Sequence, residues 1–303
     1  MIDQAASLRE LMRGRKDERQ RVDLTETSGT PYTLAITSGK GGVGKTSIAV
    51  NLSLLLARMG RQVWFVDADF GLANAEVLLG VAPRFNLAHV LRGTVDLASA
   101  WCDVADGVRL LSSGSGLEDA ANIGAVQVAS LINRVKETAG SDGLVVVDTG
   151  PGIDDPVISI LTAADEVVVV TTPEPTALTD CYATMKVLFA RRPESDVTLV
   201  INCCESPSQA DSLAKALGDV CRRFLTTSFR RYQYLPVDKT VARAIQAQKP
   251  LVFSSYRNRT EPWLRKLAVE IDQRIRDRQL ALLRREDAFQ TSDAYRSSVI
   301  GAV

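Results

Sequence analysis

Residues 38–47 read SGKGGVGKTS, a stretch in which glycines and lysines leave little side chain to pack a core. Glycine is costly to order, so such a run indicates backbone that closely approaches something else. The stretch fits the pattern G-x-x-x-x-G-K-[ST] between an apolar run and a helical pattern. In that setting backbone N–H groups converge on phosphate oxygens, a lysine adds a full positive charge and a hydroxyl can bind Mg²⁺. The sequence therefore predicts a triphosphate site formed by Gly39, Gly41, Gly42, Val43, Gly44, Lys45, Thr46 and Ser47.

Two acidic motifs fit the same chemistry. VWFVDADFG carries Asp67 and Asp69, and LVVVDTGPG carries Asp148, each at the end of an apolar run. Carboxylates beside a triphosphate would repel it unless Mg²⁺ or the proton of a water molecule intervenes. Acidic residues at strand ends are often merely solvated. With a phosphate-binding loop upstream, however, these residues predict a site for ATP and Mg²⁺.

The elements that must position these residues follow from the apolar pattern beyond residue 32. The strand-like runs are YTLAIT, QVWFVD, VRLLSS, LVVVDT, EVVVVTT and VTLVIN, and helical patterns cover about 49–59, 122–139, 153–163, 176–190 and 208–221. Apolar runs separated by helical crossovers are typical of a parallel sheet covered on both faces. We expect an α/β fold with a doubly wound, mostly parallel sheet, whose ligands bind at the carboxyl ends of its strands.

The chain divides into four predicted parts. Residues 1–30 are a partner-binding segment and linker, 31–255 the α/β domain, 256–289 an amphipathic helix and 290–303 a flexible tail. In the first part, apolar residues at helical spacing predict a short amphipathic helix that waits for a partner; they are Ile2, Ala5, Leu8, Leu11 and Met12. In the third part the helical intervals are those of Leu264, Leu267, Ala268, Ile271, Ile275 and Leu282.

Composition excludes several classes of protein. Lys plus Arg equals Asp plus Glu at 36 each, so no overall field attracts nucleic acid. The five cysteines have no C-x-x-C spacing, which predicts reduced, mostly buried thiols. The single histidine, His89, is expected to lie on a helix surface or in a cap. Without a membrane-spanning run or the apolar centre of a signal peptide, a cytoplasmic location is expected.

The loop KGGVGKT resembles the deviant Walker A signature of the MinD/ParA class of P-loop ATPases, and the spacing of the phosphate-site motifs agrees over roughly residues 33–255. The resemblance implies the SIMIBI, MinD-like fold and a slow, Mg²⁺-dependent ATPase that is activated by ATP-dependent homodimerisation. Lys40 would reach across the dimer axis to the partner's nucleotide and act like an arginine finger. The alternative for Lys40 is an ordinary solvated lysine.

The same resemblance assigns roles to the acidic motifs. Asp69 would position the attacking water, Asp67 would lie near the metal shell and Asp148 would hold Mg²⁺ through water. The amide of Gly150 or Gly152 would sense the γ-phosphate. Pro151 departs from the family pattern and has no N–H, which predicts slower hydrolysis.

Base recognition follows from weaker similarity. VTLVINCCE and YLPVDKTVARAI resemble the family's last strand and the following loop, where an asparagine and a proline-flanked backbone grip adenine. The candidates are Asn202, Pro236 and Asp238, although a strand-end asparagine is otherwise a turn former. Asn74, just after the first acidic motif, belongs to the same predicted nucleotide set.

Within the class, DADFGLANAEVLLG and the N-terminal DQAASLRELM are similar to the FlhG (FleN, YlxH) branch, which regulates flagellar number. The similarity implies that the N-terminal segment docks on an FlhF-like GTPase of the signal-recognition type and stimulates it. The matching positions are Asp3, Gln4, Ala5, Leu8 and Arg9.

The resemblance also implies a peripheral membrane contact by the C-terminal helix in the ATP dimer. Residues 275–289 interleave basic residues with Leu280, Leu282, Leu283 and Phe289. A helix packed on its own domain is an equal alternative.

Proteins with this fold have other functions, and each makes a different demand on the sequence. A ParA-like DNA-partition or protein-positioning ATPase would need a basic face, for which the candidates are Arg257, Arg259, Arg265, Lys266, Arg274 and Arg276. Zero net charge disfavours nucleic acid as a partner. A MinD-like division-site regulator is a further alternative. Iron–sulfur carriers need paired cysteines and tyrosine kinases a C-terminal tyrosine cluster, whereas the tail has only Tyr295.

Overall fold

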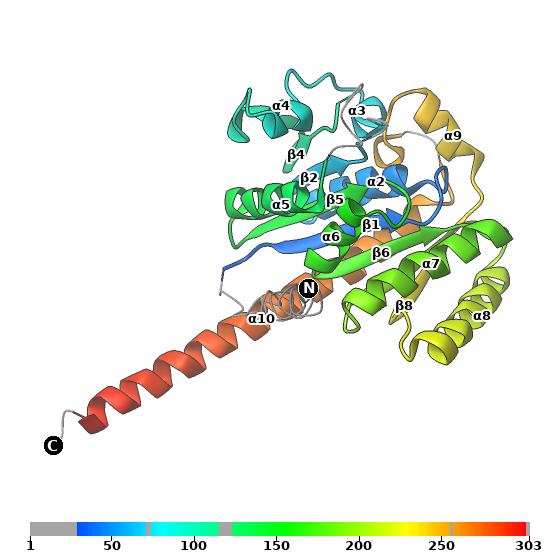
Figure 1. Cartoon of the computed structure of the whole chain (residues 1–303). Coiled ribbons are helices and arrows are strands. Elements are labelled where there is room, and N and C mark those ends of the chain that lie inside the picture. Colours follow the sequence, from blue (N-terminus) through cyan, green and yellow to red (C-terminus); the bar gives the residue numbers. More distant parts are fainter. Residues whose placement is uncertain (1–28, 71–73, 115–122, 255–256, 301–303) are drawn as a thin grey trace, which may run out of the picture.

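The computed structural model describes residues 29–70, 74–114, 123–254 and 257–300, with side chains described as far as Arg284. Within these ranges an eight-stranded sheet has the order β3-β4-β2-β5-β1-β6-β7-β8 (Figure 1). Its strands are β1 (Tyr32–Ser38), β2 (Gln62–Ala68), β3 (Cys102–Ala105), β4 (Val108–Leu111), β5 (Gly143–Thr149), β6 (Glu166–Thr171), β7 (Val197–Cys204) and β8 (Arg231–Pro236). All neighbouring strands are parallel except β3 and β4, so the predicted doubly wound, mostly parallel sheet is confirmed.

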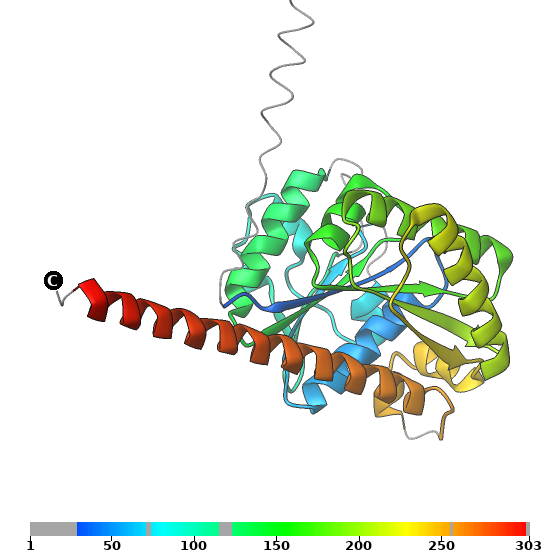
Figure 2. The ribbon, with the colours of Figure 1, turned by 90° about the horizontal axis from the view of Figure 1, so that it is seen from below.

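Helices cover both faces of this sheet. They are α2 (Lys45–Arg58), α3 (Asn74–Leu79), α4 (Leu87–Leu91), α5 (Ala125–Ala139), α6 (Asp155–Ala163), α7 (Pro175–Arg191), α8 (Pro207–Leu225), α9 (Lys239–Gln246) and α10 (Glu261–Ile300). Figure 2 shows α5 to α8 on one side of the sheet and α2 and α10 on the other. Each side has its own apolar cluster, because near-continuous Val and Leu strands present apolar residues to both faces.

The two edges of the sheet differ from the prediction. The expected last strand, VTLVIN, is β7, and β8 pairs in parallel beyond it. The short strand β3 closes the opposite edge in antiparallel pairing with β4. Both added strands lie at edges, where only one neighbour and partial burial are required, so polar residues interrupt their apolar pattern. These two strands were therefore not among the strands predicted from continuous apolar runs.

The C-terminal helix is divided between the domain and the solvent. Its first half packs against α2 and buries Leu264, Leu267, Ala268, Ile271 and Ile275. Its second half leaves the body of the protein (Figures 1 and 2). Leu280 and Leu283 are 52% and 57% exposed. The helix continues past the predicted end at Phe289 as far as Ile300.

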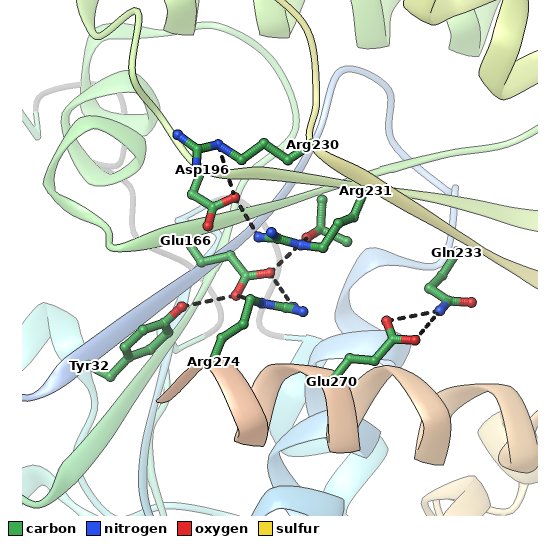
Figure 3. Close-up of polar contacts among 9 residues, drawn as sticks. Tyr32, Glu166, Asp196, Arg230, Arg231, Gln233, Glu270 and Arg274 are labelled. Atoms are coloured by element: carbon green, nitrogen blue, oxygen red, sulfur yellow. Dashed lines mark hydrogen bonds and ion pairs between the residues drawn. The ribbon is translucent and has the colours of Figure 1, made fainter. Parts of the chain in front are cut away.

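A buried polar cluster fastens the first half of α10 to the starts of β1, β6 and β7 (Figure 3). The Glu166 carboxylate, with no exposed surface, accepts hydrogen bonds from both Nε (2.9 Å) and Nη2 (2.6 Å) of Arg274. It also accepts from the Tyr32 hydroxyl at 3.0 Å and the Thr198 hydroxyl at 2.8 Å. Burial and the neighbouring Glu166 charge raise the pKa of Tyr32 far above its ordinary range, so the phenol stays a donor. The cluster therefore satisfies a carboxylate that burial would otherwise strongly disfavour.

Smaller expectations about single residues are confirmed. His89 completes a capping box at the start of α4, where its backbone N–H donates to the Asn86 side chain at 3.3 Å. The five cysteines are free, and three of them, Cys181, Cys204 and Cys221, are buried.

In the described part of the chain, no group of three or more metal-ligating side chains of the His, Cys, Asp or Glu type is present. Over the same residues, no helix combines the length and the apolar character that crossing a bilayer requires.

Candidate nucleotide-binding and hydrolysis site

The glycine-rich loop connects β1 to α2 at the carboxyl edge of the sheet. Gly42 and Gly44 have φ of 80° and 91°, a backbone region that side chains disfavour. Gly44 is the residue before the first turn of α2, so the unpaired N–H groups of that turn face the loop. Val43 between them is buried and anchors the loop to the core. The local sequence thus builds a concave backbone with donors directed toward an anion.

Gly39 is required for a different reason. A methyl group added there would lie 2.3 Å from the backbone carbonyl of Asp180 in α7. Gly39 is therefore a packing contact between the loop and a helix that is far away in the sequence, in addition to the role that the motif predicts for it. The glycines therefore serve two kinds of close approach. Gly39 lets the loop pack against α7, and the other glycines leave room for the predicted phosphate ligand.

Lys45 lies beneath the loop in a buried ion pair. Its Nζ is 2.8 Å from Oδ1 of Asp148 and 3.4 Å from the Thr46 hydroxyl, and the lysine is 6% exposed. Burial raises the pKa of Asp148, and the Lys45 ammonium opposes that shift. This ion pair holds the Lys45 ammonium close to the side of the loop toward which the backbone N–H groups point.

Asp67 and Asp148 lie side by side because they are register partners on β2 and β5. Asp67 accepts hydrogen bonds from the backbone N–H of Asp69 at 3.1 Å and of Ala75 at 3.2 Å. Burial, together with the Asp148 charge, raises the pKa of Asp67 to about 8. Two adjacent buried carboxylates are a costly arrangement that favours the uptake of a cation or a proton.

These residues fit a Mg²⁺ ion. Oδ2 of Asp148 is buried and has no hydrogen-bond partner among the described residues. Thr46, Asp67 and Asp148 supply the hydroxyl and carboxylate oxygens that Mg²⁺ prefers. The three residues predicted to surround the metal are thus brought together by β2, β5 and the start of α2.

Asp69 follows the end of β2 and faces the third motif. A methyl group added at Gly150 would lie 3.7 Å from Oδ1 of Asp69. In the same motif the N–H of Gly152, whose φ is 112°, donates to the Ser38 carbonyl at 2.9 Å. The Gly152 amide is therefore engaged inside the chain in this state. Pro151 lies beside Gly41, where an added methyl group would be 4.0 Å from the proline ring.

Lys40 has a partner that the motif does not predict. Its Nζ lies 2.7 Å from Oε2 of Glu174 and 3.0 Å from the Thr176 hydroxyl, at the start of α7. The ion pair is partly exposed, with side-chain exposures of 38% for Lys40 and 64% for Glu174. Lys40 is thus outside the core, as expected, but held by its own chain. The stretch TTPEP at the end of β6 was the sequence signal for this neighbourhood, since it ends a strand at the ligand edge.

The candidates for base recognition are used within the chain. Asn202 Nδ2 donates to the Val43 carbonyl at 2.8 Å and so supports the phosphate loop from β7. Asp238 caps α9 through Thr240 and also accepts from the backbone N–H of Arg259 and Thr260. Pro236 ends β8, and Asn74 is the exposed first residue of α3. Their role toward adenine stays a prediction.

The remaining predicted positions divide in two. The partner-binding residues Asp3, Gln4, Ala5, Leu8 and Arg9 lie outside the described residues. The proposed basic face is largely neutralised, because Arg265, Lys266, Arg274 and Arg276 each pair with a carboxylate of Glu261, Glu270, Glu166 and Asp272, respectively.

Comparison with known proteins adds a family and several relatives. A family model named ParA, described as the NUBPL iron-transfer P-loop NTPase, matches residues 30–272. Antiactivator FleN of Pseudomonas aeruginosa is 36% identical over 239 residues, which cover 79% of this chain and 85% of that protein. Flagellum site-determining protein YlxH of Helicobacter pylori is 34% identical over 222 residues, covering 73% and 74%, respectively.

Solved structures agree on the architecture. The septum site-determining protein MinD from Pyrococcus horikoshii OT3, complexed with Mg-ADP, superposes with a TM-score of 0.67 at 25% identity and covers 80% of this chain and 96% of that one. The ATP complex of a McdA variant from Cyanothece has a TM-score of 0.64 at 20% identity, covering 80% and 95%, and shows the shared fold.

Proposed function

The chain belongs to the ParA/MinD family of P-loop NTPases, and from this membership we propose that it is an ATP-dependent dimerising switch that regulates flagellar number or placement. Its activity as an ATPase follows from the family. The observation that carries the proposal is the buried Lys45–Asp148 pair beneath the glycine-rich loop, with Asp67 in register and Asp148 Oδ2 unpartnered among the described residues. The flagellar part rests on the similarity to FleN and YlxH.

In this proposal the loop binds the triphosphate through its backbone amides and through Lys45. A phosphate group entering the site draws the Lys45 ammonium partly away from Asp148. Thr46, Asp67 and Asp148 would hold Mg²⁺, which neutralises phosphate charge when bound. Asp69, beside Gly150, orients the attacking water toward the terminal phosphate.

In the proposed dimer, Lys40 of one subunit neutralises phosphate charge on the nucleotide bound by the other subunit. To do so it must leave Glu174 and Thr176 of its own chain. An exposed ion pair of this kind contributes only about 0–1 kcal/mol, so the exchange is inexpensive. Dimerisation and hydrolysis are thereby linked through one side chain.

Three substitutions separate these roles. We expect Lys45→Ala to abolish ATP binding, Asp69→Ala to trap an ATP-bound dimer and Lys40→Ala to bind ATP as a monomer without turnover. Calorimetry with Mg²⁺ and ATP, light scattering and phosphate release measure the three properties. A Lys40→Ala protein that dimerises and hydrolyses at the normal rate would refute the role in trans.

The flagellar role is tested through the N-terminal segment. We expect deletion of residues 1–12 to abolish stimulation of an FlhF-like GTPase while leaving ATP binding intact. Unchanged stimulation would remove the FlhG-like assignment and leave the ATPase switch standing.

Membrane contact is restricted to the outer half of α10 in our proposal. Ile275 is 2% exposed and belongs to the core, whereas Leu280 is 52% exposed. In sedimentation with anionic vesicles and ATP, we expect Leu280→Asp to reduce recovery in the vesicle pellet. Val269→Asp, which changes a residue 53% exposed on the packed half, is the matched control. Equal recovery of the two variants would contradict the assignment.

A DNA-binding switch has less support. The carboxylate partners of Arg265, Lys266, Arg274 and Arg276 leave little unopposed charge on the proposed face. Salt-dependent retention on DNA in the presence of ATP would favour that alternative.

A further inference from the structure

A groove lies at the point where α10 leaves the body of the protein. It has a volume of about 420 Å³ and is lined by residues from three segments, which include Gly29, Tyr32, Ser141, Ile275, Leu282 and Leu283. Tyr32 and Ile275 are buried and form its floor, and Leu283 at its outer end is 57% exposed. It lies away from the nucleotide site, because β1 begins at Tyr32 and the phosphate loop follows the other end of that strand.

The groove presents both apolar and polar surface, and no element among the described residues covers it. Arg278 lies over the Tyr32 ring at 5.5 Å and pairs with Asp165 at 3.1 Å, so its charge is already balanced. Gln279 already accepts a hydrogen bond from Arg61 at 3.0 Å. The lining side chains that remain are the apolar Leu282 and Leu283 and, across from them, the polar Thr30, Ser141 and Asp142. A surface with apolar side chains on one side and polar ones on the other suits an amphipathic helix, whose apolar face packs on the leucines while its polar face meets the polar rim.

The sequence that precedes Gly29 contains an amphipathic pattern. Residues 1–28 precede Gly29, and Gly29 lines the groove. Near the start of that segment, Ile2, Ala5, Leu8, Leu11 and Met12 recur at helical spacing. A helix over residues 2–12 would be about 16 Å long. A chain of 16 residues, the length of the stretch 13–28, has a root-mean-square end-to-end distance of about 22 Å, which is enough to connect such a helix on the groove to Gly29.

We propose that residues 2–12 of this chain dock into the groove formed by residues 29–32, 141–142 and the 275–283 stretch of α10. Short tethers give an effective concentration in the millimolar range, so a weak intrinsic affinity suffices. Docking buries the apolar face of the segment together with Leu283. It therefore withholds the segment from other proteins and covers part of the outer half of α10 at the same time.

The regulatory consequence rests on the proposed function, whereas the docking does not. If the segment binds a GTPase and outer α10 binds lipid, docking inhibits both contacts, and release of the segment frees both. The two outputs would then respond together.

Hydrogen exchange of the full-length protein without nucleotide tests the docking. We expect amides of residues 2–12 to exchange about ten-fold more slowly than in an unstructured peptide, independently of protein concentration. Leu283→Asp should abolish this protection, because it places a charge in the groove. Val269→Asp, which alters a residue of similar exposure on α10 outside the groove, should preserve it. Deleting residues 1–12 should speed exchange in residues 280–284.

Three results would overturn the proposal. They are exchange of residues 2–12 at the unstructured rate in the wild type, equal protection in the Leu283→Asp and Val269→Asp proteins, and protection that rises with protein concentration. The last result would place the segment on a second copy. The exchange experiment contains neither ATP nor a partner protein. A negative result would therefore not bear on the proposed ATPase switch, and docking can still be measured if the proposed switch is wrong.

Discussion

Asp67 and Asp148 occupy a position that folding alone disfavours. Both carboxylates are fully buried, and their strands hold them in direct register. The Lys45 ammonium bonds directly to Asp148, and Asp67 relies on two backbone N–H donors. A site of this kind trades stability of the ligand-free protein for affinity toward cationic or proton-donating ligands.

Asp67→Asn should change how stability depends on pH. The pKa of Asp67 is raised from an ordinary value near 4 to about 8, so the native state retains a proton that the unfolded chain releases. Ligand-free stability therefore falls as pH rises through this window. We expect wild type to lose roughly 3–4 kcal/mol of unfolding free energy through this group between pH 5 and pH 8, and the asparagine variant to lack this loss.

Urea unfolding without nucleotide at the two pH values measures this difference. Asp103→Asn is the control, since Asp103 is exposed with a side-chain exposure of 83%. Parallel pH curves for wild type and Asp67→Asn would contradict the assignment of a raised pKa.

Gly39→Ala and Gly42→Ala should differ although both lie in the same loop. An added methyl group at Gly39 meets the Asp180 carbonyl at 2.3 Å, whereas at Gly42 nothing lies within 4 Å. Gly42→Ala incurs only the strain of φ 80°, about 1 kcal/mol. Gly39→Ala must displace α7, and we expect a loss of about 3 kcal/mol. Thermal unfolding of the ligand-free proteins makes the comparison, and similar losses would mean that the loop can move away from α7.

Helix α10 is joined to the sheet by buried polar contacts as well as by apolar packing. Glu166 with Arg274 and Asp272 with Arg61 connect the helix to the opposite end of the sheet from the nucleotide site. Removing one member of a buried pair leaves a charge without its partner. We therefore expect the packed half of α10 to stay attached to the domain.

Arg274→Met tests this attachment. We expect it to lower the free energy of unfolding by about 3–5 kcal/mol, because the Glu166 carboxylate stays buried. The double variant Glu166→Gln/Arg274→Met should recover a large part of that loss. Arg276→Ala, whose side chain is 57% exposed, should cost less than about 1 kcal/mol in the same denaturation series. No recovery in the double variant would show that packing, and not charge, dominates.

Over the described residues, the molecule combines an α/β domain with a helix that projects from it (Figure 2). The nucleotide edge and the point where α10 departs lie at opposite ends of the sheet. If the proposed switch couples ATP to a contact on outer α10, we expect the coupling to depend on assembly of two copies, because the two places lie far apart in one copy.

Truncation should reveal this division. Removing residues 284–303 leaves the buried residues of α10 and its ion pairs in place, so we expect the unfolding free energy to change by less than about 0.5 kcal/mol. Truncation after Glu270 also removes Ile271, Ile275 and Arg274, and cooperative unfolding should be lost. Circular dichroism melts compare the two proteins, and a stable fold after the longer truncation would contradict the role of the packed half.

The sequence alone determined the central strands, the phosphate loop and the acidic motifs. These features depend on neighbouring residues: apolar runs define buried strands, and the spacing of glycines and Lys45 defines an anion-binding turn. Because all carboxyl ends of parallel strands meet at one edge, the gathering of Asp67, Asp69 and Asp148 near the loop could also be predicted.

The partners of those residues depend on the three-dimensional fold and could not be predicted from the sequence. The Lys40–Glu174 pair, the contact of Gly39 with α7 and the Asn202 bond to Val43 each join residues more than a hundred positions apart. The helical period of α10 likewise predicts an apolar face along its length, but it cannot tell which turns meet the domain. That depends on where the sheet ends: inside that limit Ile275 finds neighbours to pack against, and beyond it Leu283 remains exposed to water.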